Sequence, residues 1–374
     1  MPFPARNTLA VIGAGPVGLE AAVAALDRGF DVQVYEQGEV GSHPIAWGHV
    51  TMFTPWRAGL GPRGRAHLEA AGWPAPDLDA FPTGLELAER YLQPLAGLPE
   101  LKDRVHQHVQ VVRAGRHGLL AGEGGEARRE RPFRLLLRDP GGRESFVHAF
   151  SLIDATGVYA HPDRAGTGGV PARNELYLRP QLAYHVEDVL GLARERYEGK
   201  RTLVFGSGTY ATITVLDLAR LAEQVPGTSA VWVTREPAAA LFPRLADDPL
   251  PGRRAVLERA RALAAGAHPQ VAHLGGAEIE GFEFNSATHR YRVMLALGDQ
   301  PYVEEVDRVV INAGFSADTS LCRLLQPGEP QFHVLGHKSR GVLAGGGGDP
   351  GFLLADGYRQ VEEAVARLAQ EVNG

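Results

Sequence analysis

Apolar residues occur along the chain in short blocks that alternate with helical patterns. Residues 9–12 are apolar at every position, which is typical of a parallel strand buried on both faces. A glycine-rich turn, an alanine-rich helical pattern from about Val17 to Arg28 and a second apolar block at 32–35 follow without a break. This order predicts a strand–helix–strand unit near the N-terminus.

The same order returns at residues 200–235, where an apolar block, a Gly-Ser-Gly turn and a helical pattern to about Glu223 precede another apolar block. A basic helical pattern covers 253–265, and a helix with one apolar face is expected from about 352 to 372. Shorter patterns of β type lie between these elements, at residues 108–112, 133–138, 145–149, 152–157, 278–284, 289–297 and 306–312.

These elements predict an α/β protein with two Rossmann-like dinucleotide-binding domains, the second inserted in the first, and additional β-meander strands. Residues 1–160 and 305–374 would form the discontinuous first domain, and residues 161–304 the inserted domain. The length of 374 residues suits two to three domains at roughly 100–200 residues each.

The first turn has the spacing of a dinucleotide-binding turn. Gly13 permits the tight turn, Gly15 lets the backbone approach a pyrophosphate, and Gly18 allows the helix to pack closely on the strand. The N-terminus of the helix directs its N–H groups at the phosphates. Glu36 ends the second strand, where a carboxylate accepts hydrogen bonds from ribose hydroxyls. The predicted binding residues here are Gly13, Gly15, Pro16, Val17, Gly18, Glu36 and Gln37.

In the second turn Gly206 and Gly208 have the first two glycine roles, and Ala211 replaces the third glycine. Arg235 stands where the first repeat has Glu36, and a guanidinium there suits a 2′-phosphate, which favours NADPH over NADH. The competing interpretation is a relic of the fold that binds no nucleotide. The predicted contacts are Gly206, Gly208, Thr209, Tyr210, Ala211 and Arg235.

Charge and cysteine content narrow the function classes. The net charge of −6 argues against a nucleic-acid-binding protein, which would carry a basic stripe. The single cysteine, Cys322, excludes a Cys-x-x-Cys redox pair and a cysteine-rich metal site, and we expect no metal. No stretch approaches the ~18–20 uninterrupted apolar residues of a membrane-spanning helix, and the first residues lack a signal-peptide core. We therefore expect a cytoplasmic protein that does not bind membranes.

Four segments together resemble the two-dinucleotide-binding flavoprotein superfamily, which includes glutathione-reductase-like enzymes and flavin-containing monooxygenases. They are residues 11–36, 154–157, 203–235 and 311–319, and the resemblance covers nearly the whole chain. It implies that the N-terminal site holds FAD and that the inserted site holds NAD(P)H. It also implies that the Asp-Ala-Thr-Gly turn, with Thr156 and Gly157, marks a crossing between the domains. The FAD assignment follows from this resemblance and not from the glycine spacing.

The superfamily usually has a C-terminal strand that ends in Gly-Asp, whose Asp contacts the ribityl chain of the flavin. Two places in this chain compete for that role. Gly336-His337 follows the better strand pattern, whereas Gly348-Asp349 has the expected residue types inside a run of four glycines. Gly336 and Asp349 are therefore both candidate flavin contacts, and a flexible surface loop is the alternative for the glycine run.

Residues 41–57 follow the second strand and are dense in aromatic and titratable side chains. The resemblance implies that this stretch passes beside the flavin. Trp47 and Trp56 are then candidates for the wall of a flavin or substrate pocket, His49 for a hydrogen-bond donor and Arg57 for an anion-binding group. The alternative is a packed loop whose tryptophans belong to the core.

Monooxygenases of the superfamily carry Phe-x-Gly-x-x-x-His between the two sites. This chain has no such match, and His185 lies in a similar place. The candidate catalytic residues are therefore His49, Arg57 and His185. The leading hypothesis is an FAD-dependent oxidoreductase that accepts hydride from NAD(P)H and passes it to oxygen or a small-molecule substrate, with monooxygenation as one form. One alternative is an FAD-dependent oxidase or dehydrogenase that acts directly on a small organic substrate with a vestigial second site. Another is a non-catalytic flavin-binding sensor. We expect a homodimer only because two-fold symmetric dimers are the commonest oligomers of soluble proteins.

Overall fold

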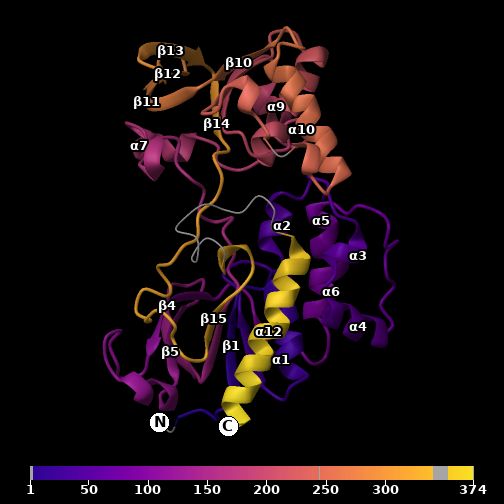
Figure 1. Cartoon of the computed structure of the whole chain (residues 1–374), viewed down its shortest axis with the longest axis vertical. Coiled ribbons are helices and arrows are strands. Elements are labelled where there is room, and N and C mark those ends of the chain that lie inside the picture. The colour runs from indigo at the N-terminus through magenta and orange to yellow at the C-terminus, as the bar shows by residue number, and fades with distance from the viewer. Residues whose placement is uncertain (1–2, 244, 340–352, 374) are drawn as a thin grey trace. The chain divides into compact units, whose positions relative to one another are not determined.

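The computed structural model describes residues 3–243, 245–339 and 353–373 (Figure 1). The chain divides into two compact units, residues 1–161 with 316–374 and residues 162–315. The second unit ends later in the sequence than the predicted domain. Residues 305–315 belong to it because strand β14 (Arg308–Ile311) pairs in parallel with strand β8 (Arg201–Phe205).

A five-stranded parallel sheet forms the centre of the first unit, in the order β15-β7-β1-β2-β3. Val11 of β1 lies opposite Ile153 of β7 on one side and opposite Val34 of β2 on the other. This central position explains why β1 is apolar at successive residues and is almost fully buried. The strands are β1 (Thr8–Ile12), β2 (Asp31–Tyr35), β3 (Val105–His106), β7 (Ser151–Asp154) and β15 (Phe332–Val334).

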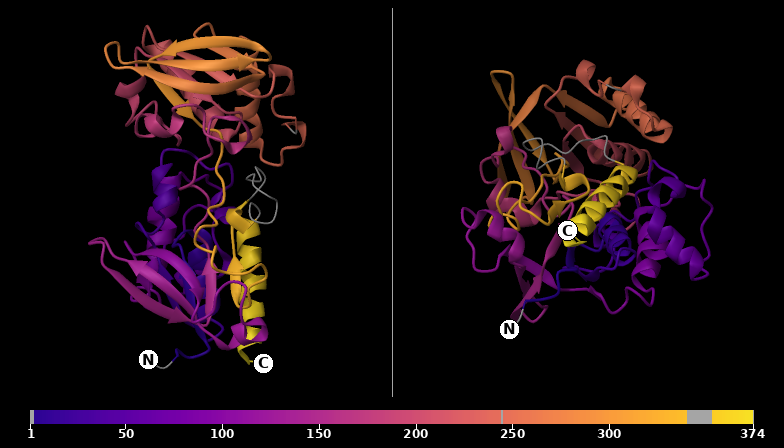
Figure 2. Two further views of the ribbon diagram at one scale, coloured as in Figure 1. Left: turned by 90° about the vertical axis from the view of Figure 1, so that its left-hand side faces the viewer. Right: turned by 60° about the horizontal axis from the view of Figure 1, so that its bottom comes forward.

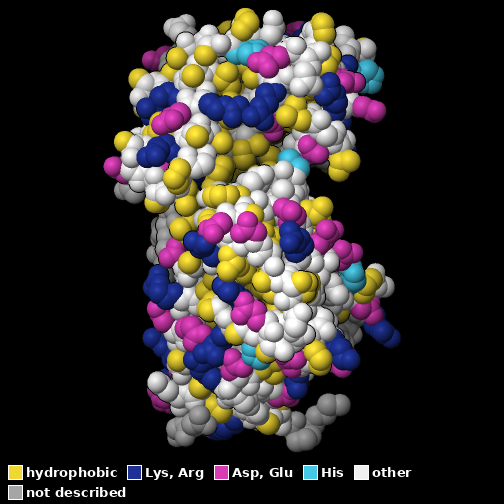
Figure 3. Space-filling view, turned by 90° about the vertical axis from the view of Figure 1, so that its right-hand side faces the viewer, with side chains coloured by type: hydrophobic (Ala, Val, Ile, Leu, Met, Phe, Trp, Pro, Cys, Tyr) yellow, Lys and Arg dark blue, Asp and Glu magenta, His cyan; other side chains and the backbone are white. Residues whose placement is uncertain are grey.

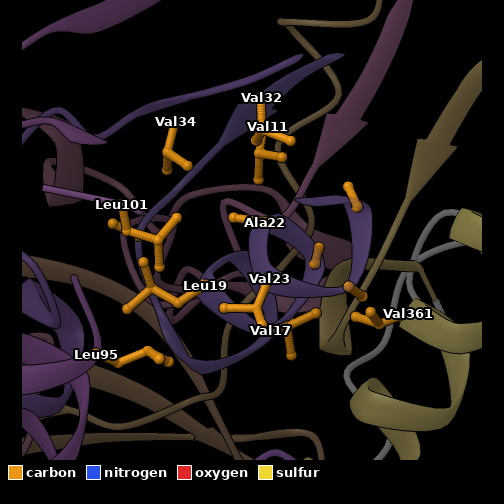
Figure 4. Close-up of a cluster of buried hydrophobic side chains, with 14 of the residues drawn as sticks. Val11, Val17, Leu19, Ala22, Val23, Val32, Val34, Leu95, Leu101 and Val361 are labelled. Atoms are coloured by element: carbon orange, nitrogen blue, oxygen red, sulfur yellow. The ribbon is translucent and has the colours of Figure 1, made fainter. Parts of the chain in front are cut away.

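One face of this sheet is covered by helices. Figure 4 shows Val11, Val32 and Val34 above Val23 of α1 and Val361 of α12. Figure 1 shows α12 (yellow) running beside α1. Each fully buried Val or Leu side chain stabilises a fold by about 1.5–3 kcal/mol. Because this cluster contains many such side chains, it contributes a large part of the unit's stability. The helices are α1 (Pro16–Leu26), α2 (Ser42–Ala46), α3 (Trp56–Gly59), α4 (Pro62–Ala70), α5 (Gly84–Leu87), α6 (Gln93–Ala96) and α12 (Leu354–Asn373).

The opposite face of the sheet packs against a three-stranded antiparallel sheet. Ala10 and Ile12 of β1 belong to a cluster with Phe133 and Leu135 of that sheet, since alternate residues of a strand point to opposite faces. The left view of Figure 2 shows this sheet in magenta. Its strands are β4 (Gln110–Arg116), β5 (Phe133–Arg138) and β6 (Glu144–Ala149).

A buried ion cluster ties the antiparallel sheet to the segment that leads into β15. The guanidinium groups of Arg116 and Arg128 both donate to the carboxylate of Glu329, at distances of 2.6–3.1 Å. All three side chains are fully buried, and the Arg116 guanidinium also lies 3.7 Å from the ring centre of Phe133. Removing one of these three side chains would strongly destabilise the fold, because the others would remain charged and buried.

The second unit also contains a parallel sheet, in the order β10-β9-β8-β14, and an antiparallel sheet, β11-β12-β13 (orange in Figure 2). Its further strands are β9 (Ser229–Thr234), β10 (Val271–Gly275), β11 (Ala277–Asn285), β12 (Arg290–Leu297) and β13 (Gln300–Val306). Its helices are α7 (Glu175–Leu178), α8 (Arg194–Tyr197), α9 (Thr209–Gln224) and α10 (Pro251–Ala264).

The predicted fold class is confirmed, because two parallel sheets flanked by helices occur together with two antiparallel sheets. The predicted block at 306–312 is interrupted: β13 ends at Val306 and β14 begins at Arg308. The patterns missed β3, β10 and β13 and the short helices between residues 56 and 96. Among the residues that the structure describes, no helix combines the length and apolar composition needed to cross a bilayer.

Ion pairs connect three helices at the surface of the first unit. Glu362 of α12 binds Arg28, at the end of α1, at 2.9 Å, and also binds Arg63 of α4, which in turn binds Asp27 at 2.6 Å. Acidic and basic side chains are interspersed over this unit on the face shown in Figure 3. Hydrogen bonds from Arg63, with a smaller effect of Arg28, lower the pKa of the Glu362 carboxyl from 4.5 to about 2.

We expect Glu362→Gln to lower the free energy of unfolding by about 1 kcal/mol at pH 7, since partly exposed pairs contribute about 0.2–1 kcal/mol each. A carboxyl whose pKa is lower in the folded state stabilises the fold above its unfolded pKa. This stabilisation should be lost as the pH falls through 4.5 towards about 2. Urea unfolding at several pH values measures it. Glu363→Gln, on the exposed side of the same helix, is the control. A deficit of E362Q that stays constant between pH 7 and pH 3 would contradict the prediction.

Candidate functional site

The first glycine turn has the close contacts that its sequence predicts. Gly13 has a φ of +102°, and a Cβ at this position would lie 2.7 Å from the carbonyl oxygen of Ala155. A Cβ on Gly18 would lie 1.9 Å from the carbonyl oxygen of Gly13, whereas one on Gly15 would meet no atom within 4 Å. The turn is therefore packed on the protein side and open at Gly15, where α1 begins and its N–H groups can bind phosphate.

Glu36 lies beside this turn and is almost fully buried. Its carboxylate accepts hydrogen bonds from the backbone N–H of Ala14 and of Gly38, each at 2.8 Å. One carboxylate oxygen thus holds the glycine turn and the other holds the chain after β2. The oxygen that binds Gly38 also accepts the hydroxyl of Ser42 at 3.4 Å. The oxygen that binds Ala14 has a second lone pair with which it can accept a ribose hydroxyl. The exposed Gln37 follows directly.

A buried ion pair underlies the turn from the other side. Lys338 Nζ lies 2.7 Å from Asp154 Oδ2 and 2.9 Å from Thr156 Oγ1, and Lys338 is 1% exposed. Thr156 also donates its hydroxyl to Asp154 Oδ1 at 2.7 Å, which fixes the turn that follows β7. Cys322 Sγ donates to the same Asp154 carboxylate at 3.4 Å. The sequence analysis named Asp154 only as part of the Asp-Ala-Thr-Gly turn. It did not predict the pair with Lys338, because the two residues lie far apart in the chain.

Gly336 follows β15, as the strand pattern predicts, and lies beside the first turn of α1. A Cβ on Gly336 would be 3.6 Å from Val17 Cγ2. Its N–H donates to Gln360 Oε1 of α12 at 2.7 Å. Gly336 therefore lies where it can contact a group bound at the N-terminus of α1. The competing candidate, Asp349, lies outside the described residues.

The aromatic segment 41–57 contributes to packing more than the sequence suggests. Trp56 is 1% exposed and belongs to the helix-side core, under the guanidinium of Arg90, so it does not wall a pocket. The ring of Trp47 packs directly on Gly84, and a Cβ on Gly84 would lie 2.4 Å from that ring. Arg57 is exposed and forms an ion pair with Asp79.

Two histidines of this segment, His43 and His49, are partly buried in the first unit. His49 is partly buried, and its Nε2 has no hydrogen-bond partner among the described residues. His43, at the start of α2, has its ring centre 5.5 Å from that of Tyr159. Its Nδ1 lies 3.9 Å from where a Cβ on Gly157 would be. His43 and Tyr159 thus lie beside the predicted Thr156–Gly157 turn. Tyr159 was missed because it lies just beyond the Asp-Ala-Thr-Gly motif.

The second glycine turn repeats the first with changes. Gly206 has a φ of +130°, and a Cβ there would lie 2.2 Å from the carbonyl oxygen of Asn312. Gly208 precedes α9 and faces open space, as Gly15 does. The buried Ala211 shows that this turn has room for one methyl group where the first has none. The indole N–H of Trp232 donates to the Gly206 carbonyl at 2.8 Å, which holds the turn.

Arg235 lies beside the second glycine turn, where the sequence places it. It lines a small hollow of about 50 Å³ together with Gly206, Ser207, Gly208 and Glu236. Its guanidinium lies 5.0 Å from the ring centre of Phe205 and donates to backbone carbonyls of residues 165 and 166. Glu236 was missed by the sequence analysis. A carboxylate here suits a ribose 2′-hydroxyl and opposes a 2′-phosphate, so the two neighbouring charges favour different coenzymes.

The start of α9 carries the other predicted contacts of this unit. Thr209 is its first residue, and Tyr210 packs edge-on against Phe315, with ring centres 5.7 Å apart. Burial raises the pKa of the Tyr210 hydroxyl to about 12. His185 also packs on Phe315, at 5.6 Å. His185 therefore belongs to the second unit, whereas His49 and Arg57 belong to the first, and no single unit contains all three predicted catalytic residues.

Larger hollows in the first unit lie away from these residues. One of about 410 Å³ is lined by residues of β4, β5 and β6, and one of about 390 Å³ lies over β1, β2 and β6. Neither is lined by a predicted site residue. In the described part of the chain, no cluster of three or more His, Cys, Asp or Glu side chains has the arrangement of a metal site.

Solved structures resemble this chain over almost its whole length. The bacillithiol disulfide reductase Bdr of Bacillus cereus has a TM-score of 0.72 at 16% identity and covers 97% of this chain and 98% of its own. The ornithine N-hydroxylase of Kutzneria sp. 744, with reduced FAD, NADP⁺ and L-ornithine, has 0.64 at 16% and covers 98% and 99%. Thioredoxin reductase of T. acidophilum has 0.60 at 14% and covers 98% and 99%.

The chain has the fold of the two-dinucleotide-binding flavoproteins. Neither a protein-family model nor a curated protein sequence matches it. Among these flavoproteins are disulfide reductases and N-hydroxylating enzymes, so the shared fold does not select one reaction. The side chains that surround the two turns must select it instead.

We expect Gly18→Ala to destabilise the apoprotein by at least about 2 kcal/mol, because the new methyl group forces α1 away from β1. Gly15→Ala is the matched control in the same turn. It should cost less than about 1 kcal/mol, since its methyl group meets no protein atom and only the helix cap changes. Thermal unfolding measures both. Equal melting temperatures for the two variants would contradict the proposed packing.

Proposed function

We propose that this chain is an FAD-dependent oxidoreductase that accepts hydride from NADPH and passes it to oxygen or a small-molecule substrate. One observation carries the proposal. Each unit has a glycine turn that is packed on its protein side and open at the glycine preceding a helix. An acid follows the second strand in one unit, and an arginine follows it in the other.

The first unit fits FAD. The open position at Gly15 and the N–H groups at the start of α1 would hold the pyrophosphate, and the Glu36 carboxylate would accept the ribose hydroxyls. Bound FAD would supply the hydride and electron transfer that amino-acid side chains cannot perform. His43 and Tyr159, beside Gly157, are polar groups able to orient a substrate or hold a proton near that turn.

The second unit fits the adenosine half of a nicotinamide coenzyme. Gly208 leaves room for the pyrophosphate at the start of α9, and Arg235 would bind the 2′-phosphate of NADPH. The hydroxyl of the neighbouring Tyr210 stays protonated at physiological pH, because burial raises its pKa to about 12. It is thus able to donate a hydrogen bond but not to serve as a base.

The state of Cys322 disfavours a disulfide substrate. Thiol–disulfide exchange requires a thiolate. Burial, with a further effect of the Asp154 carboxylate, raises the pKa of the Cys322 thiol to about 12. The acceptor that we propose is therefore oxygen or a small molecule that reacts without a protein thiolate, and monooxygenation is one form of this reaction. We further propose that the protein acts in the cytoplasm without nucleic acid or membrane partners.

The test is the visible spectrum of the purified protein before and after addition of NADPH under nitrogen. We expect a flavin spectrum that bleaches with NADPH and bleaches more slowly with NADH. A flavin spectrum that neither nucleotide changes would contradict hydride transfer from a nicotinamide and favour the oxidase alternative. A protein that binds no flavin after reconstitution with FAD would overturn the proposal.

Two matched variants separate the sites. Gly15→Ala should lose FAD binding, because its methyl group occupies the space left for the pyrophosphate. Gly208→Ala should keep the flavin spectrum but weaken bleaching by NADPH at least ~10-fold, for the same steric reason in the second unit. Flavin content and anaerobic reduction rates measure the two effects. If each variant lost both properties equally, the assignment of one cofactor to each turn would be wrong.

A further inference from the structure

Arg235 is held by a loop of its own unit. Its Nη2 donates to the carbonyl oxygens of Gly166 at 3.0 Å and Ala165 at 3.2 Å. The face of the guanidinium lies over Phe205. Within the described residues, the structure records hydrogen bonds from Nη2 alone. The donors on Nε and Nη1 are therefore available to an anion in the hollow that Arg235 lines.

The loop itself is closed at its base by a buried carboxylate. We call residues 166–171 the Gly166 loop. The fully buried Glu175 accepts the backbone N–H of Ala165 at 3.1 Å and that of Ala172 at 2.7 Å, on the two sides of the loop. It also accepts the hydroxyl of Tyr184 at 2.9 Å. These bonds fix the positions of the carbonyl groups to which Arg235 donates.

The backbone inside the Gly166 loop is also tightly folded. A Cβ on Gly166 would lie 2.3 Å from the carbonyl oxygen of Val170 and 2.8 Å from the N of Ala172. By contrast, Thr167, Gly168 and Gly169 are exposed at the surface. Only a glycine at position 166 allows the two sides of the loop to meet, and its carbonyl points at Arg235 as a result.

Holding Arg235 matters because Glu236 is its neighbour at the same hollow. A mobile guanidinium would pair with that carboxylate, and the pair would present little net charge to a phosphate. An arginine whose Nη2 is engaged by two carbonyls keeps its planar fork in one orientation. Its remaining donors then bind an anion without a further loss of side-chain entropy.

We propose that the Gly166 loop is the element that sets coenzyme specificity, by positioning Arg235 for the 2′-phosphate of NADPH. Gly166 and Ala165 act through Arg235 and are positioning residues, and Glu175 holds them in place. This inference rests on the proposed use of NADPH. It goes beyond it by assigning the preference for NADPH to a backbone loop outside the glycine turn.

The experiment compares the dissociation constants of NADPH and NADH for Gly166→Ala and for Thr167→Ala. We expect Gly166→Ala to weaken NADPH binding about 10-fold, the order of one charge-assisted hydrogen bond, and to change NADH binding less than about 2-fold. Thr167→Ala, on the exposed part of the same loop, should leave both constants unchanged. If Gly166→Ala retains the wild-type ratio of the two constants, the loop does not set specificity.

Hydrogen exchange provides a second test that needs no coenzyme. It uses a different variant, so it can be made even if Gly166→Ala does not fold. In Arg235→Ala, the amides of residues 166–170 and 172 should exchange at least about 5-fold faster than in the wild type, because Gly166 and the adjoining Ala165 each lose a hydrogen bond. Amides of β12 serve as the internal control. Unchanged exchange in the loop would overturn its link to Arg235.

The outcomes also separate this inference from the proposed function. If the wild-type protein binds neither NADPH nor NADH, both the coenzyme assignment and the loop's role are wrong. If it binds NADPH more tightly than NADH and Gly166→Ala keeps that preference, only the loop's role is wrong.

Discussion

The first unit depends on one close approach between a helix and a strand. The carbonyl oxygen of Gly13 occupies the space that a side chain at Gly18 would need. Because no Cβ is present there, α1 begins against the end of β1, and its N–H groups lie at the carboxyl edge of the sheet. The Ala155–Thr156 backbone then fits against Gly13 from the side of β7. The open position at Gly15 is the consequence of this packing and is the basis of the proposed cofactor site.

In both units a charged side chain after the second strand is held by backbone groups of the opposite polarity. The Glu36 carboxylate accepts two backbone N–H groups, and the Arg235 guanidinium donates to two backbone carbonyls. Each charge is thus fixed in direction before any ligand arrives, which reduces the entropy that binding costs. The difference in sign between the two residues is what distinguishes a site for ribose hydroxyls from a site for a phosphate.

The sequence predicted the parts of the fold that depend on local spacing. Apolar blocks and glycine turns identified β1, α1, β8 and α9, because their geometry needs particular residues a few positions apart. Lys338 and Asp154 meet only after the second unit has intervened, and no local pattern reports such a contact. The buried pairs of Glu329 with Arg116 and Arg128 were missed for the same reason. Trp56 shows a different limit, since an aromatic residue next to titratable ones fits a core or a pocket equally well until its burial is known.

The insertion of one unit into the other also has a consequence for synthesis on the ribosome. The edge strand β15 and the helix α12, which cover β7 and α1, lie beyond residue 315. At about 5–20 residues per second, they leave the ribosome on the order of ten seconds after the first half of their own unit. During that interval the apolar face of α1 that later contacts Val361 has no covering helix. The first unit therefore exposes this apolar surface until its last two elements have been made, whereas residues 162–315 of the second unit are all synthesised before them.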